Sequence, residues 1–274
     1  MKTIVVTGGS SGVGGALVTR LLAAGHSVWN LDVQAPIDGE NRARYLQCDL
    51  SRQESIDAAI AELPEDIDAL ANVAGIARST PPDTVLAVNF LGLRHLSEAL
   101  MLRLSDGGTV ISVSSIAGRD WQGKYERLLP LLETASMADG LAWCEANREV
   151  LARDPYTFSK RCVTAYTLRT AQQALARGVR INCVSPGVID TPLYPQFEAM
   201  MTKEQSEWII EKTARSATPD DIAQVIDLLA TAECGWLNGV DIPVDGGYTA
   251  GIESGWIDLE ASPLVLERRR AQKQ

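Results

Sequence analysis

A strand-like segment runs directly into a glycine-rich turn near the start of the chain. Residues 3–7, TIVVT, form a short β-branched apolar run, and residues 8–25 continue as GGSSGVGGALVTRLLAAG. A buried strand, a glycine turn and a helix in this order place backbone N–H groups and a helix N-terminus where a pyrophosphate can bind. With the next strand, the pattern predicts a βαβ unit and a parallel sheet.

Apolar runs and helical segments keep alternating along the rest of the chain. Further strands are expected at 27–32, 43–49, 67–75, 108–115, 179–187 and 240–247. Helices are expected at 51–63, 82–104, 156–177 and 219–231, with Ser51 and Thr218 as N-caps and Glu54 completing a capping box. The alternation predicts the α/β class: a Rossmann-like, three-layer αβα, doubly wound parallel sheet of about seven strands in one domain, 1–274.

Two segments interrupt this alternation, and both follow the C-terminal end of an expected strand, where such folds bind ligands. Residues 119–154 are expected to form a helical insertion in two pieces, around 124–135 and 137–152. Residues 188–217 are expected to form a substrate lid. Its apolar side chains are Leu193, Tyr194, Phe197, Met200, Met201, Trp208 and Ile209. A solvated helical hairpin and a packed helix pair without function are the respective alternatives.

Charge and composition exclude several other kinds of protein. The formal net charge is −10, so phosphate backbones would repel the chain and we expect no nucleic-acid partner. No run of about 18 apolar residues is present and the N-terminal apolar run is short, so we expect a cytoplasmic protein without a membrane span or signal peptide. The five cysteines form no CxxC pair, and neither His26 nor His95 has ligand spacing, so no metal site is expected.

Asp32 ends the second expected strand and bears on the choice of nucleotide. A carboxylate in this position accepts hydrogen bonds from the adenosine ribose and repels a 2′-phosphate. No lysine or arginine follows it before Arg42. These features favour NAD over NADP as the cofactor. The alternative is that Asp32 only helps to form the turn after the strand.

The segment YTFSK places Tyr156 and Lys160 four residues apart, which brings both side chains to one face of a helix. One interpretation is a surface helix with an extended lysine side chain. The other is that the ammonium group lowers the pKa of the phenol and allows it to exchange protons near neutral pH. The segment by itself does not distinguish the two.

An ordered set of motifs gives the sequence a wider resemblance. The motifs are TGGSSGVG, NVAG at 72–75, VNFLG around Asn89, SSIAG at 114–118, YTFSK, SPGVIDTP at 185–192 and VDGG at 244–247. In this order the sequence resembles the short-chain dehydrogenase/reductase family, of the shorter-subunit type, over residues 3–248. The insertion before Tyr156 is similar to one in a branch of that family, which contains bacterial 3α-hydroxysteroid dehydrogenase/carbonyl reductase and the coniferyl-alcohol dehydrogenases.

The resemblance implies four catalytic residues. Tyr156 would be the general acid/base, and Ser115 would hydrogen-bond the substrate oxygen. Lys160 would hold the nicotinamide ribose and lower the pKa of Tyr156, with the positive charge of the oxidised cofactor adding to this effect. Asn89 would position a water molecule in a proton relay. Because Ser114 and Ser115 are adjacent at a strand end, only one can face the substrate, and Ser115 matches the family position.

The resemblance also implies a set of NAD-binding residues, whose backbone or side chains would contact the adenosine, pyrophosphate or nicotinamide groups. They are Gly8, Ser10, Ser11, Gly12, Val13, Gly14, Asp32, Asp49, Leu50, Asn72, Ala74, Gly75, Tyr156, Lys160, Pro186, Gly187, Val188 and Thr191.

The sequence therefore predicts an NAD(H)-dependent oxidoreductase that interconverts a secondary or bulky hydrophobic alcohol, of steroid, terpenoid or aryl type, and its carbonyl compound. The alternatives are an NAD-binding regulatory protein without catalysis, and an epimerase or dehydratase of the same family. We expect a homodimer or homotetramer, and the insertion would favour the dimer by covering a helix face that tetrameric relatives use for assembly.

Overall fold

The computed structural model describes residues 1–36, 43–78, 81–191, 194 and 201–271, and its centre is a seven-stranded sheet. All strand pairs are parallel, in the order β3-β2-β1-β4-β5-β6-β7. The strands are β1 (Thr3–Thr7), β2 (Ser27–Asp32), β3 (Arg44–Gln47), β4 (Ile67–Asn72), β5 (Leu104–Val113), β6 (Arg180–Pro186) and β7 (Asp241–Val244). The order reverses beside β1, which confirms the predicted doubly wound fold.

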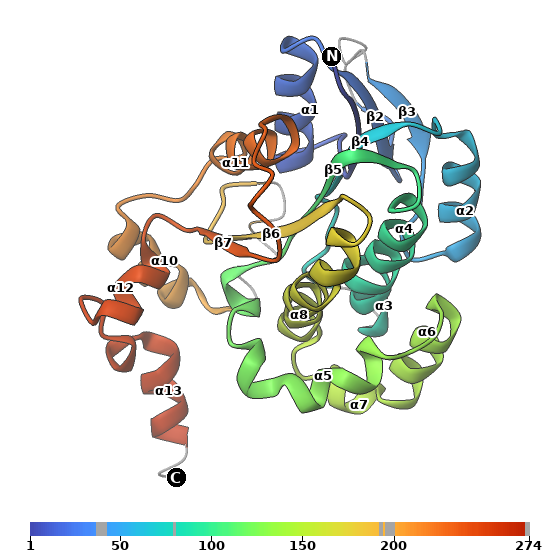
Figure 1. Cartoon of the computed structure of the whole chain (residues 1–274). Coiled ribbons are helices and arrows are strands. Elements are labelled where there is room, and N and C mark those ends of the chain that lie inside the picture. Colours follow the sequence, from blue (N-terminus) through green and yellow to red (C-terminus); the bar gives the residue numbers. More distant parts are fainter. Residues whose placement is uncertain (37–42, 79–80, 192–193, 195–200, 272–274) are drawn as a thin grey trace.

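Helices cover both faces of the sheet and complete three layers (Figure 1). One face is covered by α1 (Gly12–Ala23) and α11 (Pro219–Thr231), which share an apolar core with Ile4 and Val6 of β1. The opposite face is covered by α2 (Gln53–Glu62), α4 (Leu93–Leu100) and α8 (Pro155–Leu175), which share a second core with Val5. Neighbouring residues of β1 thus point to opposite layers, as the pleat of a strand requires.

The helix ends follow the sequence signals in one place and depart from them in another. Thr218 caps α11, and Asp221 completes a reciprocal capping box, so the predicted cap is confirmed. The predicted cap at Ser51 is wrong. The Ser51 hydroxyl instead donates to the Asp49 carboxylate at 2.7 Å, and α2 begins at Gln53 after Arg52, without a side-chain cap.

The expected helix at 82–104 is interrupted and shorter. It consists of α3 (Asp83–Leu86), the π-helical turn η1 (Ala87–Gly92) and α4, and β5 already begins at Leu104. Within η1, Gly92 lies so close to Leu50 that an added Cβ would be 2.0 Å from the Leu50 carbonyl oxygen. The wider turn therefore accommodates a close backbone approach that the sequence pattern does not reveal.

The insertion forms η3 (Trp121–Lys124), α5 (Tyr125–Leu132), α6 (Met137–Ala146) and α7 (Arg148–Leu151). The second expected piece is divided at Asn147, whose side chain donates to the Trp143 carbonyl and competes with the helical ladder. Leu128, Leu131 and Cys144 are fully buried in the core beneath α8. The insertion therefore packs on the helix layer that contains α3, η1 and α8, and its buried side chains join the core on that side of the sheet.

The C-terminal part of the chain forms a third, smaller core beside the sheet. Its residues come mainly from α10 (Lys203–Thr213) and from α12 (Tyr248–Ser254) and the loop after it, and Ile116 of η2 (Ile116–Gly118) packs against them. The short helices η4 (Leu259–Ala261) and α13 (Pro263–Ala271) follow in the chain. Ile209, Tyr248 and Ile257 are its buried centre. Of the expected lid residues, Leu193, Phe197 and Met200 lie outside the described residues. Among the helices described, none has both the length and the apolar character needed to cross a membrane.

Candidate active site

A large cavity of about 1620 Å³ opens at the C-terminal ends of β1, β4, β5 and β6. The glycine turn and Asp32 line one end of it, and Ser115, Tyr156 and Lys160 line another part. Segments that are far apart in the chain, including α10 and the C-terminal α12, line the remaining side. The cavity thus occupies the edge of the sheet where doubly wound folds bind their ligands.

The glycine turn is shaped by close backbone contacts. Gly8 has a φ of +70°, and an added Cβ would be 2.8 Å from the Ala74 Cα atom. A Cβ on Gly14 would be 2.1 Å from the Gly8 carbonyl oxygen, so larger residues fit at neither position. The Ser11 side chain does not cap α1. The first N–H groups of this helix are therefore available on the cavity side for an anionic group.

The Asp32 carboxylate is held in a fixed orientation at the end of β2. Its Oδ2 accepts a hydrogen bond from the Ser10 backbone N–H at 3.0 Å, and its Oδ1 accepts one from Gln34 at 3.1 Å. The Ser10 hydroxyl in turn accepts from the Asn30 amide. The described lining residues around Asp32, at 31–34 and 48–50, include no basic side chain. This end of the cavity suits neutral hydroxyl groups better than a phosphate.

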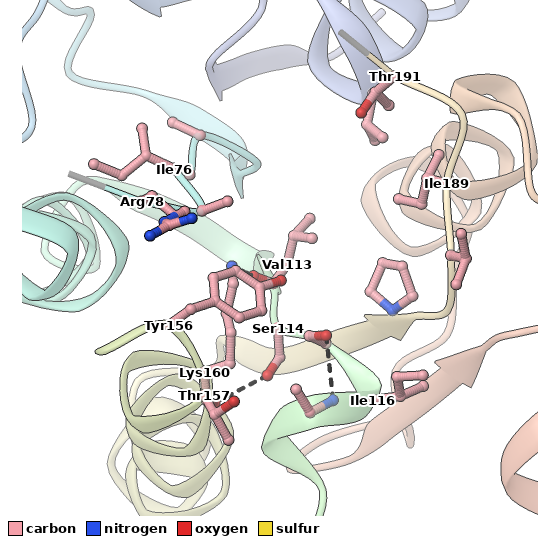
Figure 2. Close-up of a pocket in the computed structure, with 18 of the residues that line it drawn as sticks. Ile76, Arg78, Val113, Ser114, Ile116, Tyr156, Thr157, Lys160, Ile189 and Thr191 are labelled. Atoms are coloured by element: carbon pink, nitrogen blue, oxygen red, sulfur yellow. Dashed lines mark hydrogen bonds between the residues drawn. The ribbon is translucent and has the colours of Figure 1, made fainter. Parts of the chain in front are cut away.

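Tyr156 and Lys160 share the cavity side of α8, and Figure 2 shows both side chains beside Val113. The Lys160 Nζ atom donates to the Val113 carbonyl oxygen at 2.8 Å and lies 5.8 Å from the centre of the Tyr156 ring. The Ser115 hydroxyl lies close enough to the Tyr156 phenol to lower the pKa of the phenol. The structure therefore brings together three of the four residues to which the sequence assigns catalysis.

The protein environment shifts the pKa values of both groups against their charged forms. Burial raises the pKa of Tyr156 to about 12; the nearby Ser115 hydroxyl acts to lower it and the Asp154 carboxylate acts to raise it. Burial also lowers the pKa of Lys160 to about 8. The expected lowering of the tyrosine pKa is thus wrong for these side chains alone, because desolvation of the phenolate outweighs the other effects.

The two adjacent serines have different environments. The Ser114 hydroxyl donates to the Lys160 backbone carbonyl at 3.0 Å and contacts the Thr164 hydroxyl at 2.7 Å, so it joins β5 to α8. The Ser115 Oγ atom accepts from the Ala117 backbone N–H at 3.2 Å and reaches Tyr156. The pleat of the strand separates the two side chains as expected and leaves Ser115 for the cavity.

Asn89 is buried behind the cavity wall, in the π-helical turn η1. Its side-chain oxygen accepts from the Ile76 N–H at 2.8 Å, and its amide donates to the Ile76 carbonyl and to the Ser159 hydroxyl. An added Cβ on Gly75 would lie 3.3 Å from the Asn89 oxygen and 3.5 Å from the Lys160 Nζ atom. Asn89 therefore holds the loop after β4 close to Lys160.

The other predicted cofactor residues divide into those that line the cavity and those that support it. The lining ones are Gly8, Ser11, Gly12, Val13, Gly14, Asp32, Asp49, Leu50, Ala74, Gly75, Tyr156, Lys160, Pro186, Gly187, Val188 and Thr191. Ser10 supports Asp32 from behind. Asn72 is buried among Ser97 and Ser112, to which its amide donates, and does not reach the cavity.

The comparisons with known proteins agree with this geometry. The sequence profile described as short chain dehydrogenase matches residues 2–125, and the one described as Enoyl-(Acyl carrier protein) reductase matches residues 126–249. A coniferyl-alcohol dehydrogenase from Pseudomonas sp. (strain HR199 / DSM 7063) is 36% identical, over 91% of this chain and 97% of that protein. The chain belongs to the short-chain dehydrogenase/reductase family. It is accordingly an oxidoreductase.

Two further relatives are similar over nearly the whole chain. The 3-alpha-hydroxysteroid dehydrogenase/carbonyl reductase of Comamonas testosteroni is 27% identical, over 91% of this chain and 97% of that protein. The crystal structure of the 3-alpha-hydroxysteroid dehydrogenase from Pseudomonas sp. B-0831, complexed with NADH, has a TM-score of 0.74 at 27% identity. The match covers 93% of this chain and 100% of that one. The resemblance to this branch is therefore confirmed.

Sequence reasoning missed part of the cavity wall. Gln205 of α10 and Leu259 and Leu264 of the C-terminal segment line the cavity, and none of them belongs to a motif. The apolar character of 188–217 indicated that a wall existed there, but no local pattern could indicate which side chains face inward. The contribution of the residues beyond α12 depends entirely on tertiary packing.

Proposed function

We propose that the protein is an NAD(H)-dependent dehydrogenase/reductase that interconverts a bulky hydrophobic alcohol and its carbonyl compound. The observation that carries the proposal is that Ser115, Tyr156 and Lys160 line the cavity together, with the Ser115 hydroxyl close enough to the Tyr156 phenol to lower its pKa. A phenol and a serine hydroxyl that converge in this way can both contact one substrate oxygen.

The cavity residues fit a nicotinamide dinucleotide. The close packing of Gly8 and Gly14 leaves the N-terminus of α1 open to a pyrophosphate, and Asp32 would accept the adenosine ribose hydroxyls. Lys160 would hold the ribose of the nicotinamide, with Val188 and Thr191 beside the ring. When bound, the cofactor supplies the hydride acceptor or donor. The carboxylate of Asp32 and the absence of basic lining residues near it, within the described chain, support NAD over NADP.

In the oxidation direction, the Tyr156 oxygen would remove the hydroxyl proton of the alcohol while Ser115 donates a hydrogen bond to the same substrate oxygen. The Lys160 ammonium group would stabilise the phenolate electrostatically. A positive charge about 5 Å away, in an effective dielectric near 20, contributes about 3 kcal/mol, which corresponds to about two pKa units. Asn89 would keep the Gly75 loop in register with Lys160 and so preserve this arrangement.

The cavity wall opposite Tyr156 supports a hydrophobic substrate. Met201 and Ile209 come from the lid region, and Ile252 and Leu264 come from the C-terminal helices. Relatives of this chain are named for coniferyl alcohol, a 3α-hydroxysteroid and cyclopentanol. Aryl and alicyclic alcohols are therefore the compounds to test first.

The test is to supply NAD and, separately, NADP with aryl, steroid and terpenoid alcohols and to follow NADH or NADPH formation by absorbance. We expect turnover with NAD and no turnover by the Tyr156→Phe variant, which should still bind NADH. If no alcohol is oxidised while NADH binds, the result would favour the regulatory, non-catalytic alternative. Faster turnover with NADP would contradict the role given to Asp32.

We also propose that the insertion limits assembly to a dimer. It covers α8 through specific contacts: Arg161 pairs with Asp120 at 2.6 Å, and Arg169 contacts both Tyr125 and Glu133 at 2.9 Å. These contacts occupy part of the helix surface on which another subunit would pack. Light scattering of the protein in solution tests the proposal, and a stable tetramer built on α8 would contradict it.

A further inference from the structure

The lid helix α10 carries an amide side chain in an apolar part of the cavity wall. Gln205 is 5% exposed, and its buried neighbours on the helix are Ser206 and Ile209. Met201 and Leu264 line the cavity together with it. An amide group in such surroundings is unfavourable unless its donor and acceptor find partners. The two ends of the amide must therefore be considered separately.

A backbone contact fixes the orientation of this amide. The Gln205 Oε1 atom accepts a hydrogen bond from the Leu264 backbone N–H at 3.0 Å. A backbone N–H can only donate, so the oxygen must be the end that points to α13. Leu264 lies in the first turn of α13, where N–H groups have no acceptor within the helix. Rotation of the amide by half a turn would leave that N–H unsatisfied.

The other end of the amide opens to the cavity. Within the described part of the chain, the Nε2 atom has no hydrogen-bond partner, and it is absent from the set of fully enclosed unpaired polar atoms. It therefore keeps accessible surface although the residue as a whole is buried. The accessible space beside Gln205 is the cavity that the residue lines. The wall thus presents an N–H donor in apolar surroundings.

The Gln205 donor and the reacting groups Ser115 and Tyr156 come from different elements of the fold. Ser115 and Tyr156 line the cavity from the end of β5 and from α8, whereas Gln205 lines it from α10. In Figure 1, α10 lies with α12 and α13, apart from α8. A substrate whose alcohol contacts Tyr156 would bring its far end to Gln205. A hydrogen-bond acceptor at that end would satisfy the Nε2 donor.

We propose that Gln205 is a specificity-determining residue that donates a hydrogen bond to an oxygen at the end of the substrate remote from the reacting alcohol. The substrate class is thereby narrowed to hydrophobic alcohols or ketones that carry a second oxygen, as ether, hydroxyl or carbonyl. This inference rests on the proposed function. It also makes α13 part of the binding site, because the Leu264 N–H holds the amide in place.

The experiment compares matched alcohols that differ only in the remote oxygen. One pair is cinnamyl alcohol and its 4-methoxy derivative; the other is 5α-androstane-3α,17β-diol and its analogue without the ring-D hydroxyl. Binding is measured by calorimetry to the NADH-loaded protein, in which an alcohol has no oxidant to react with. We expect the oxygen-bearing member of at least one pair to bind about threefold to tenfold more tightly, the range for one neutral hydrogen bond.

Three variants test whether Gln205 causes the difference. Gln205→Met removes the donor at nearly constant volume and should bring the ratio within that pair close to one. Gln172→Met, at an exposed position of α8, is the matched control and should keep the wild-type ratio. Gln205→Glu keeps an oxygen for Leu264 and, when ionised, should disfavour the oxygen-bearing member. If Gln205→Met does not fold, Gln205→Glu replaces it as the test. Melting curves and NADH affinity show whether each variant is folded.

The role given to Gln205 would be overturned if both members of each pair bind equally tightly. It would also be overturned if Gln205→Met leaves the ratio of the two affinities unchanged. In either case the proposed oxidoreductase function stands. Failure of all four alcohols to bind or react, with NADH still bound, would overturn the proposed function and the assignment with it. The two failures are distinguishable because the first requires measurable binding of the plain alcohols.

Discussion

The hydroxyl of Ser115 lies close enough to the phenol of Tyr156 to lower the pKa of the phenol, although the whole insertion separates the two residues in the chain. Ser115 is the second residue after β5, and Tyr156 is in the first turn of α8. The Ser114 hydroxyl donates to the Lys160 carbonyl and thereby fixes the distance between these two elements. The pairing therefore depends on the junction of β5 and α8 and not on the length of the segment between them.

Ser115→Ala should move the pH dependence of oxidation to higher pH. The Ser115 hydroxyl lowers the pKa of Tyr156, so removing this hydroxyl raises that pKa and leaves less phenolate at any pH below it. We expect kcat/KM for alcohol oxidation to fall at least tenfold at pH 8, with the rising limb displaced upward, as pH–rate profiles will show.

The neighbouring serine provides the control. Ser114→Ala removes a buried hydrogen bond and should cost about 1 kcal/mol of stability in urea unfolding, without displacing the limb. The role of Ser115 would be refuted by an unchanged profile in Ser115→Ala, or by the same displacement in both variants.

Lys160→Met should change the pH dependence of stability in a defined direction. Burial lowers the pKa of Lys160 to about 8 in the folded protein, from 10.5. Between these pH values the unfolded chain binds the proton more strongly, so the wild type gains stability as the pH rises. The methionine variant lacks this gain. Its stability relative to the wild type should therefore be greatest below pH 8 and decline towards pH 10.5.

The magnitude follows from the same linkage. The pKa shift of Lys160 changes the free energy of unfolding by at most about 3 kcal/mol between pH 8 and pH 10.5, at 1.36 kcal/mol per pKa unit. Urea unfolding of both proteins without cofactor, from pH 7 to 10, measures it. The loss of the bond to the Val113 carbonyl adds a constant penalty in the variant and leaves the pH-dependent difference unchanged. A difference that grows in favour of the variant at high pH would contradict the prediction.

Asp32→Ala should weaken the discrimination between the two nicotinamide cofactors. The carboxylate would repel a 2′-phosphate, so its removal should improve NADP binding about tenfold and weaken NAD binding to a similar extent. Fluorescence titration with NADH and NADPH measures both. Asp66→Ala, an exposed carboxylate before β4, is the matched control for net charge and should change neither. If the Asp32 variant still discriminates between NADH and NADPH as the wild type does, another residue must recognise the adenosine ribose.

These predictions use features that the sequence conveys to different degrees. The strands, the glycine turn and the Thr218 cap could be predicted because each is a local signal of a few consecutive residues. Tyr156 and Lys160 were placed on one face correctly because helix geometry fixes that relation. The convergence of the motifs followed from the fold, since parallel strands bring their C-terminal ends to one edge.

The features that the sequence predicts wrongly depend on contacts that lie outside the recognised motifs. The pKa of Tyr156 depends on how completely the fold removes water from the phenol, which no spacing in the sequence conveys. The π-helical turn at Asn89 depends on the approach of Gly92 to Leu50. The Ser51 hydroxyl donates to the Asp49 carboxylate, a nearby acceptor, and so does not cap the helix. In each case, a contact outside the recognised pattern determined the outcome.

The buried Arg94 side chain makes a tertiary contact with the insertion that no sequence motif indicates. This arginine of α4 is 3% exposed, and it holds the insertion to the core. Its guanidinium donates to the Leu131 and Leu132 carbonyls at 3.3 and 3.4 Å, and to the Thr134 hydroxyl and the Ser136 carbonyl at 3.0 and 3.2 Å. These acceptors include the C-terminal carbonyls of α5, which carry partial negative charge.

Arg94→Met should keep the apolar stem and remove every one of these donors. Buried acceptors left without partners cost about 1–3 kcal/mol each, and part of this cost is recovered as water enters, so we expect a net loss of about 2–4 kcal/mol in urea unfolding. Amide exchange should accelerate in α5 and α6 and stay slow in β1 and β4. Arg127→Met, at an exposed position of α5, should change stability by less than about 0.5 kcal/mol. If exchange in the insertion is the same in both variants, Arg94 does not anchor it.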